Sequence, residues 1–110
     1  MPKTADQLWK VTYYISPSGD NPVSDFLDSI DKQTQTKLLR VVTNIEEYSL
    51  LSVIPHIKKL SGTPLWEIRV LGKKNARIIY VVPTQTKVLL LHGFIKKTNK
   101  TPAKEIEIAN

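Results

Sequence analysis

The sequence contains no cysteine and only two histidines among its 110 residues. Disulfides and thiolate chemistry are therefore excluded, and a structural zinc site, which takes its ligands mostly from these two residue types, is not expected. No apolar run approaches the ~18 residues that a membrane-spanning helix needs, and residues 1–6 lack the apolar core of a secretory signal. We expect a cytoplasmic protein without membrane association or cofactor.

Acidic residues are almost absent from the segment between His56 and Lys104. This segment carries eleven basic residues and one acidic residue, Glu67, whereas residues 1–55 carry five basic and seven acidic residues. Such an uneven division of charge suggests one face that binds a polyanion, most often nucleic acid. The length and the 41% apolar composition favour a single domain, residues 1–110, with one core.

The first half of the chain predicts one strand and two helices. Residues 8–15 are aromatic and β-branched, as in a strand. Pro22 suits the first position of a short helix, and Asp31 can cap a second helix that runs to about Tyr48. Apolar residues at helical spacing predict the buried stripe of the second helix: Leu38, Val41, Val42, Ile45 and Tyr48.

Strand-like runs dominate the rest of the chain. They cover residues 65–71, 77–82 and 87–94, and residues 56–60 lead into the first of them. Short links imply antiparallel neighbours. A final helix is expected over residues 103–109. The predicted fold is therefore α+β, a small antiparallel sheet with a helical hairpin on one face and a short C-terminal helix, in the order β-αα-β-β-β-α.

Alternation along the strands predicts which side chains share a face. Trp66, Ile68 and Val70 should face the helices, which leaves Glu67 and Arg69 side by side on the opposite, open face.

Further groups are expected on this open face. Arg77 should lie beside Arg69, because a core strand cannot direct an unpaired arginine inward, and His92 should share a face with Leu90 and Phe94. The flanking segments add five lysines: Lys58, Lys59, Lys96, Lys97 and Lys100. We therefore predict that the two guanidinium groups lie exposed together on a concave surface with one carboxylate and one imidazole.

Several segments of the chain resemble the RelE/ParE toxin superfamily, and in particular its phage-derived Gp49-like, HigB-type branch. The resemblance covers element order over residues 8–109 and is most specific over residues 92–105. The segments that carry it are Lys58–Leu60, Leu65–Arg69, Asn75–Tyr80 and Leu91–Thr98. In contrast to many RelE-like members, residues 104–110 contain no tyrosine, so a family role of a tail tyrosine cannot be transferred to this chain.

The resemblance implies the toxin of a type II toxin–antitoxin pair. Such toxins are messenger-RNA endoribonucleases that act on the ribosome and inhibit translation, and a helix-turn-helix antitoxin of the HigA type neutralises them. Two alternatives stay open at this stage. One is the sister ParE-like activity, inhibition of DNA gyrase, and the other is a non-catalytic RNA-binding module. A shared fold does not separate these functions.

Metal-independent RNA cleavage uses the ribose 2′-OH as the nucleophile, and it needs a base, an acid and cations. Arg69 and Arg77 suit charge stabilisation because the guanidinium fork matches phosphate oxygens. Glu67 is the first candidate for the base and His92 for the acid. A lysine crowded by other cations could replace either, because like charges depress its pKa. The flanking lysines are expected to contact phosphates and Phe94 to stack on a base.

The same residues also have structural interpretations. Glu67 and Arg69 could form a same-face ion pair worth under about 1 kcal/mol. Arg77 could bond to a main-chain carbonyl, and His92 could simply end a strand with its ring hydrogen-bonded. His56, in a connector beside Pro55, is expected to be only solvated.

Overall fold

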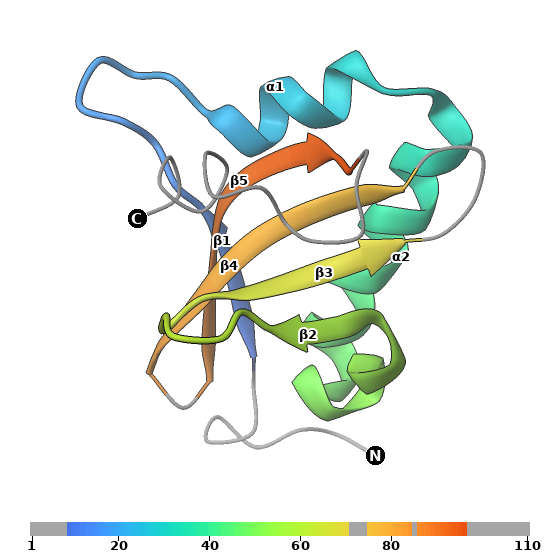
Figure 1. Ribbon diagram of the computed structural model, residues 1–110, viewed down its shortest axis with the longest axis vertical. Helices are drawn as coiled ribbons and strands as arrows, with labels where there is room; N and C mark the ends of the chain where they lie inside the picture. Colours follow the sequence, from blue (N-terminus) through green and yellow to red (C-terminus); the bar gives the residue numbers. More distant parts are fainter. Residues whose placement is uncertain (1–8, 71–74, 85, 97–110) are drawn as a thin grey trace.

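A five-stranded sheet with helices on one face forms the protein in a computed structural model, which describes residues 9–70, 75–84 and 86–96 (Figure 1). The elements in chain order are β1 (Lys10–Tyr13), α1 (Pro22–Ser29), α2 (Lys32–Tyr48), the 3-10 helix η2 (Leu50–His56), β2 (Ile57–Lys59), β3 (Trp66–Val70), β4 (Ala76–Thr84) and β5 (Lys87–Ile95). The predicted α+β class is confirmed. The predicted helix over residues 103–109 lies outside the described residues.

Side-chain caps fix where the two helices begin. The Asn21 side chain accepts a hydrogen bond from the Ser24 amide, with Pro22 in the first turn of α1. The Asp31 carboxylate accepts bonds from the Thr34 amide at 3.0 Å and from the Thr34 hydroxyl at 2.7 Å, as the sequence predicted for the start of α2. The segment after α2 was expected to be a connector and instead forms η2.

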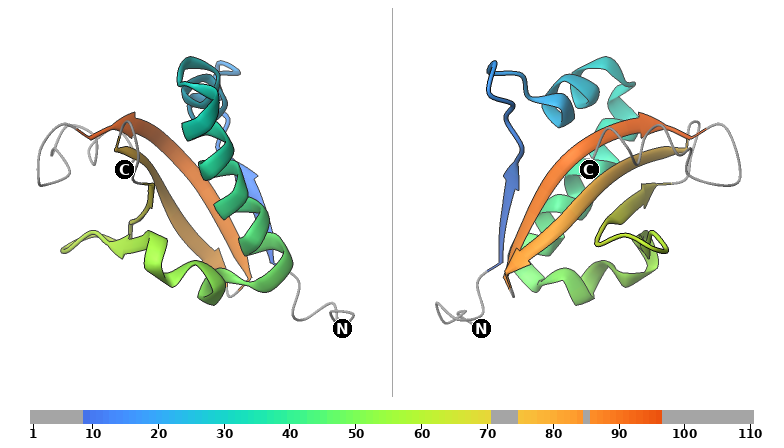
Figure 2. Two further views of the ribbon diagram at one scale, coloured as in Figure 1. Left: turned by 90° about the vertical axis from the view of Figure 1, so that its right-hand side faces the viewer. Right: turned by 60° about the vertical axis from the view of Figure 1, so that its left-hand side comes forward.

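The strand order is β1-β5-β4-β3-β2. The neighbours joined by short links, β2 to β3, β3 to β4 and β4 to β5, are antiparallel as predicted. The predicted antiparallel sheet also contains one parallel pair, because β1 pairs with β5 in parallel. β1 and β5 are the first and the last of the described elements, so no short hairpin turn joins them and fixes their relative direction. Figure 2 shows β4 and β5 curving along their length, with α2 running across one face.

The main core lies between the helices and the sheet. Leu38, Val41, Val42 and Ile45 are buried as predicted, but Tyr48 is 66% exposed. Tyr48 is the last residue of α2, beyond the part of the helix that covers the sheet, so the predicted extension of the buried stripe was wrong. A second, smaller cluster occupies the other face of the sheet: Leu60, Leu65, Ile79 and Phe94, with Val81 and Leu91 packed against it.

A shift in register between β4 and β5 changes which residues of β5 share a face. Ile79 pairs with His92, but the next residue, Tyr80, pairs with Leu90, so that Leu91 is the extra residue of a β-bulge. His92 and Phe94 therefore lie on the face opposite the helices, whereas Leu90 is buried in the main core. The prediction that Leu90 shares a face with His92 was wrong for this reason.

Gly93 holds β5 close to α1. A Cβ atom on Gly93 would lie 2.7 Å from Cγ of Phe26. Rotation of the Phe26 ring about its Cβ–Cγ bond does not move Cγ, so it cannot relieve this contact. We expect Gly93→Ala to lower the free energy of unfolding by about 1–3 kcal/mol through overpacking, measured by urea denaturation. Phe26→Leu in the same chain should recover part of this loss. Equal stability of Gly93→Ala and the wild type would contradict the close packing of α1 on β5.

Candidate functional site

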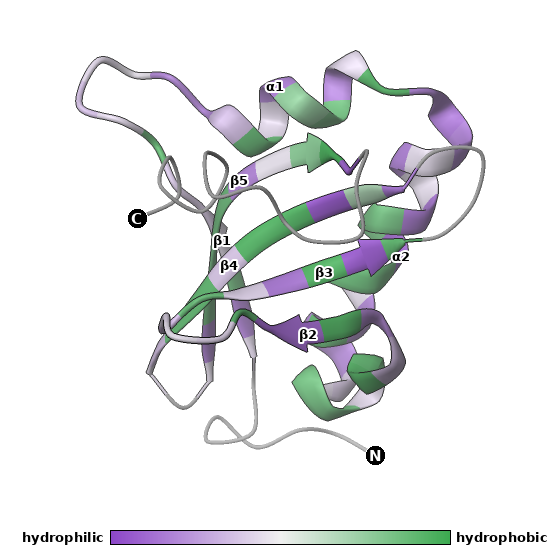
Figure 3. Cartoon of the chain, in the orientation of Figure 1, coloured by the Kyte–Doolittle hydropathy of each residue, from purple (hydrophilic) through white to green (hydrophobic). Residues whose placement is uncertain are grey.

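Charged side chains from four strands meet on the sheet face opposite the helices. The register pairs Lys58 with Glu67, and Arg69 with Arg77. The hydrophilic segments of β2, β3 and β4 accordingly lie side by side in Figure 3. We call this surface the basic face and define it by six residues: Lys58, Glu67, Arg69, Arg77, His92 and Lys96.

Glu67 and Arg77 form a buried ion pair at the centre of the basic face. The Arg77 Nε and Glu67 Oε1 atoms lie 3.4 Å apart, and the two side chains are 5% and 1% exposed. The Arg77 Nη1 group also donates a hydrogen bond to the Ala76 carbonyl at 3.1 Å. Burial lowers the pKa of Arg77 from its usual value, while the Glu67 carboxylate acts in the opposite direction. The pair fixes the direction of one guanidinium group.

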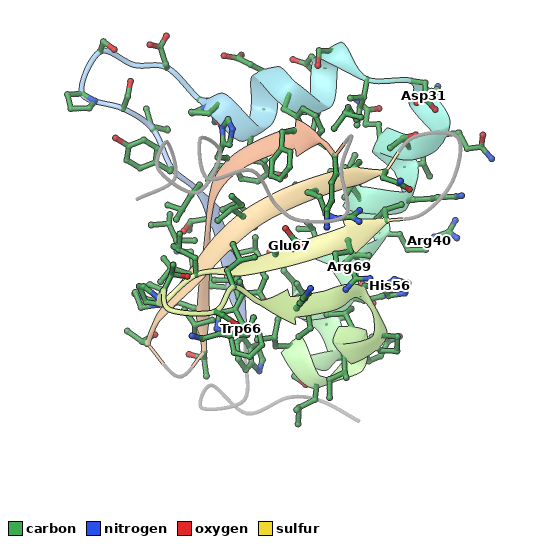
Figure 4. All side chains as sticks on the ribbon, viewed as in Figure 1. Asp31, Arg40, His56, Trp66, Glu67 and Arg69 are labelled. Carbon is green, nitrogen blue, oxygen red and sulfur yellow. The ribbon has the colours of Figure 1, made fainter. Side chains whose placement is uncertain are left out.

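This pair changes two of the sequence predictions. Arg69 and Arg77 do share a face as directly opposed partners, but Arg77 is buried rather than exposed, because Glu67 holds it. The structure also pairs Glu67 with Arg77, an ion pair that the sequence did not predict. Glu67 is also placed poorly for direct contact with a substrate, since its side chain is 1% exposed (Figure 4).

Lys96 follows directly after β5, and the charged side chains of the basic face change its pKa. Burial lowers the pKa of Lys96 from its ordinary value, and the Glu67 carboxylate opposes this change. The positive charges of Arg77, Lys58 and Arg69 lower the pKa further. From the sequence, Lys96 was expected only to bind phosphate. A lysine crowded by other cations was also expected to be able to transfer a proton, but the sequence did not indicate which lysine this would be.

His92 lies on the basic face against an aromatic neighbour. The rings of His92 and Phe94 stack with their centroids 6.0 Å apart and their planes 19° apart. Phe94 is only 8% exposed and belongs to the small apolar cluster, so it offers little surface for stacking on a nucleobase. That predicted role does not fit the structure. The half-buried His92 remains a candidate acid.

The predicted flanking lysines divide between the two faces. Lys58 opposes Glu67 and lies on the basic face, whereas Lys59 opposes Trp66 and lies on the other side. The Lys59 ammonium group lies 5.9 Å from the centre of the Trp66 ring and donates a hydrogen bond to the Thr63 carbonyl. Neighbours in a strand cannot face the same way, so the joint assignment of Lys58 and Lys59 was wrong. Lys97 and Lys100 lie outside the described residues.

The basic face can bind a group with several negative oxygens and can move a proton beside it. The basic face combines three cations (Lys58, Arg69 and Arg77), one lysine with a lowered pKa and one imidazole. This set suits a phosphodiester better than a carboxylate or a neutral ligand. Within residues 9–70, 75–84 and 86–96, no three histidine or acidic side chains are grouped closely enough to hold a metal ion. No helix in the same ranges is long and apolar enough to cross a membrane.

Comparison with known proteins finds relatives in sequence and in structure. Residues 25–110 match the model of a family described as Phage derived protein Gp49-like (DUF891). Among solved structures, a double arginine-to-alanine mutant of the E. coli toxin RelE in the free state matches with a TM-score of 0.62 and 10% sequence identity, over 94% of this chain and 95% of that chain. None of the curated proteins compared matches the sequence.

Proposed function

The chain belongs to the Gp49-like family of phage-derived proteins and has a RelE-like fold, as its resemblance to the RelE/ParE superfamily predicted, and from this premise we propose that it is the toxin of a type II toxin–antitoxin pair. Its activity is endonucleolytic cleavage of messenger RNA on the ribosome. Its partners are the ribosome, the message and a helix-turn-helix antitoxin of the HigA type, and its place of action is the cytoplasm.

The observation that carries this proposal is the convergence of four cations on one face. The positive charges of Lys58, Arg69 and Arg77 all act electrostatically on Lys96, so the four groups lie near one another on this face. A RelE-like fold alone would fit a gyrase inhibitor equally well. The combination of buried, pre-oriented Arg77 with a lysine of lowered pKa favours phosphodiester chemistry.

The chemistry that we propose needs no group outside the chain and the RNA. The ribose 2′-oxygen attacks the adjacent phosphorus, the bond from phosphorus to the 5′-oxygen breaks, and a 2′,3′-cyclic phosphate and a 5′-hydroxyl result. Neutral Lys96 takes the proton of the 2′-OH, and protonated His92 supplies a proton to the leaving 5′-oxygen. Arg69, which is partly exposed, stabilises the added negative charge on the phosphate oxygens, and the charge of buried Arg77 acts from beneath this site. Glu67 acts through Arg77, whose guanidinium it positions.

Expression in bacteria followed by transcriptome-wide mapping of RNA ends tests the proposed function. We expect growth arrest with new cuts inside translated codons, and no cuts in untranslated RNA. A DNA-damage response with intact messages would assign the gyrase activity instead. Binding to RNA with a steep dependence on salt, but without cuts on translating ribosomes, would assign a non-catalytic RNA-binding module.

The lowered pKa of Lys96 predicts a pH dependence of cleavage. The neutral form of a lysine increases as the pH rises through its pKa, while the protonated form of the acid that the mechanism also needs decreases. The single-turnover rate on ribosomes should therefore rise with pH, pass through a maximum and fall. Lys96→Gln should lower the rate by about 10²–10⁴-fold and abolish this rise. Lys87→Gln, at an exposed position at the start of β5, is the matched control. An unchanged pH profile in Lys96→Gln would exclude Lys96 as the base.

A further inference from the structure

A second cationic site lies at the side of the molecule where β3 ends, in the angle between α2, η2 and β3. A cavity of about 420 Å³ opens there. Its walls combine apolar, amide and basic side chains: Lys37, Arg40, Val41, Asn44, Pro55, His56, Arg69 and Val70. Figure 4 shows Arg40, His56 and Arg69 near one another at this side of the molecule. We call this cavity the α2–β3 pocket.

Helical spacing places the α2 side chains of the pocket on one stripe. Counted from Lys37, the other three α2 residues of the pocket follow after three, four and seven residues: Arg40, Val41 and Asn44. This spacing places all four side chains on one face of the helix. Val41 and Val70 are buried and form the floor, whereas Arg40 and His56 are exposed at the rim. No acidic residue is among those that the structure places around the pocket.

We propose that the α2–β3 pocket binds a backbone phosphate of the same RNA strand that the basic face holds. The proposal rests on the proposed function for the identity of the RNA. Three basic side chains, Lys37, Arg40 and Arg69, line the cavity, and two of them are arginines, whose forked donors match phosphate oxygens. The imidazole of His56 adds a further donor.

Arg69 connects this pocket to the basic face. It is the directly opposed partner of Arg77 across β3 and β4, and it also lines the pocket. A strand of RNA that crosses the basic face can therefore continue over Arg69 to the pocket that Arg40 lines. This continuity favours a nucleic-acid backbone, which carries a negative charge at every nucleotide, over an acidic protein segment, whose charges need not occur at both sites.

Binding of a synthetic single-stranded oligoribonucleotide to the purified full-length chain tests the proposal. The oligonucleotide carries 2′-O-methyl groups, so that it cannot be cleaved and binding is measured without catalysis. Arg40→Gln removes one cation from the pocket, and Lys87→Gln removes one cation from an exposed position at the start of β5. We expect Arg40→Gln to weaken binding about tenfold and to reduce the slope of log K against log salt by about 0.7. Lys87→Gln should change neither by a comparable amount.

Inorganic phosphate provides a second probe that does not depend on RNA. Titration at constant ionic strength should shift the NMR signals of the His56 ring and of the Arg40 side chain in the wild type, and Arg40→Gln should remove the His56 shift. If phosphate shifts these signals but Arg40→Gln leaves oligonucleotide binding unchanged, the pocket takes free phosphate and the backbone assignment is overturned.

The outcomes separate this inference from the proposed function. Uncut messages in cells, together with weaker oligonucleotide binding by Arg40→Gln, would reject the toxin nuclease and keep the pocket as a phosphate site. Equal effects of Arg40→Gln and Lys87→Gln, or no measurable binding of either probe, would overturn the pocket. Loss of antitoxin binding in Arg40→Gln with unchanged RNA binding would assign the pocket to a protein partner and overturn it as well.

Discussion

Glu67→Leu is expected to lower the free energy of unfolding by about 3–5 kcal/mol, because it leaves the buried guanidinium of Arg77 without its charged partner. Urea denaturation followed by circular dichroism measures this loss. An exposed ion pair would cost less than about 1 kcal/mol to break, so a small effect would contradict the burial of the pair.

The double variant Glu67→Leu with Arg77→Met is the control for this prediction. It replaces both charges by apolar side chains, and it should recover most of the lost stability. The same protein should nevertheless fail to cleave RNA, since it lacks the pre-oriented guanidinium. Recovery of stability without recovery of activity would show that the charged pair serves the activity and not only the stability of the fold. Full toxicity of the double variant would remove both residues from the mechanism.

Arg69→Ala is expected to lower the rate of RNA cleavage by about 10²–10³-fold while the fold remains intact, because Arg69 stabilises charge that develops on the phosphate. Arg69 is half-buried, and its positive charge opposes that of Arg77, so its removal should affect activity more than stability. Single-turnover cleavage of a message on programmed ribosomes gives the rate, and circular dichroism reports the fold.

Two controls make the Arg69 result specific. Lys87→Ala removes an exposed cation at the start of β5 and should leave the rate unchanged. Arg69→Lys keeps the charge but loses the forked donor, and it should recover only part of the activity. A rate for Arg69→Ala equal to that of the wild type would contradict a catalytic role for the basic face.

Local sequence patterns predicted those parts of the fold that depend on neighbours in the chain. The Asp31 cap with Thr34 three residues later and the buried stripe of Leu38 to Ile45 are such cases, because short-range bonds and helical periodicity decide them. Alternation along β3 likewise placed Glu67 and Arg69 on one face. The parallel pairing of β1 with β5 was missed, because no local signal reports the direction of strands from distant parts of a chain.

The sequence singled out most residues of the candidate site but not their arrangement in space. Residue type and charge singled out Arg69, Arg77, His92 and Lys96, which the structure brings together on one face, but the burial of Arg77 against Glu67 depends on tertiary packing. A single bulge residue, Leu91, breaks the simple alternation of β5 that the sequence argument assumed.

The α2–β3 pocket was missed for a related reason. Lys37 and Arg40 received no interpretation from the sequence, and His56 was expected to be only solvated in a connector. Only the packing of α2 beside the end of β3 shows that these cations surround one cavity with Arg69. The unused signal was the pair of cations three residues apart on the polar side of α2.

The chemical identity of the RNA ends tests the central claim most directly. After induction of the protein in growing cells, the account predicts cuts in translated messages that leave a 5′-hydroxyl on one fragment and a cyclic phosphate, or the 3′-phosphate formed from it, on the other. Fragments with a 5′-phosphate and a 3′-hydroxyl would show that water rather than the ribose 2′-OH is the nucleophile. That result, or messages that remain whole while growth stops, would contradict the account.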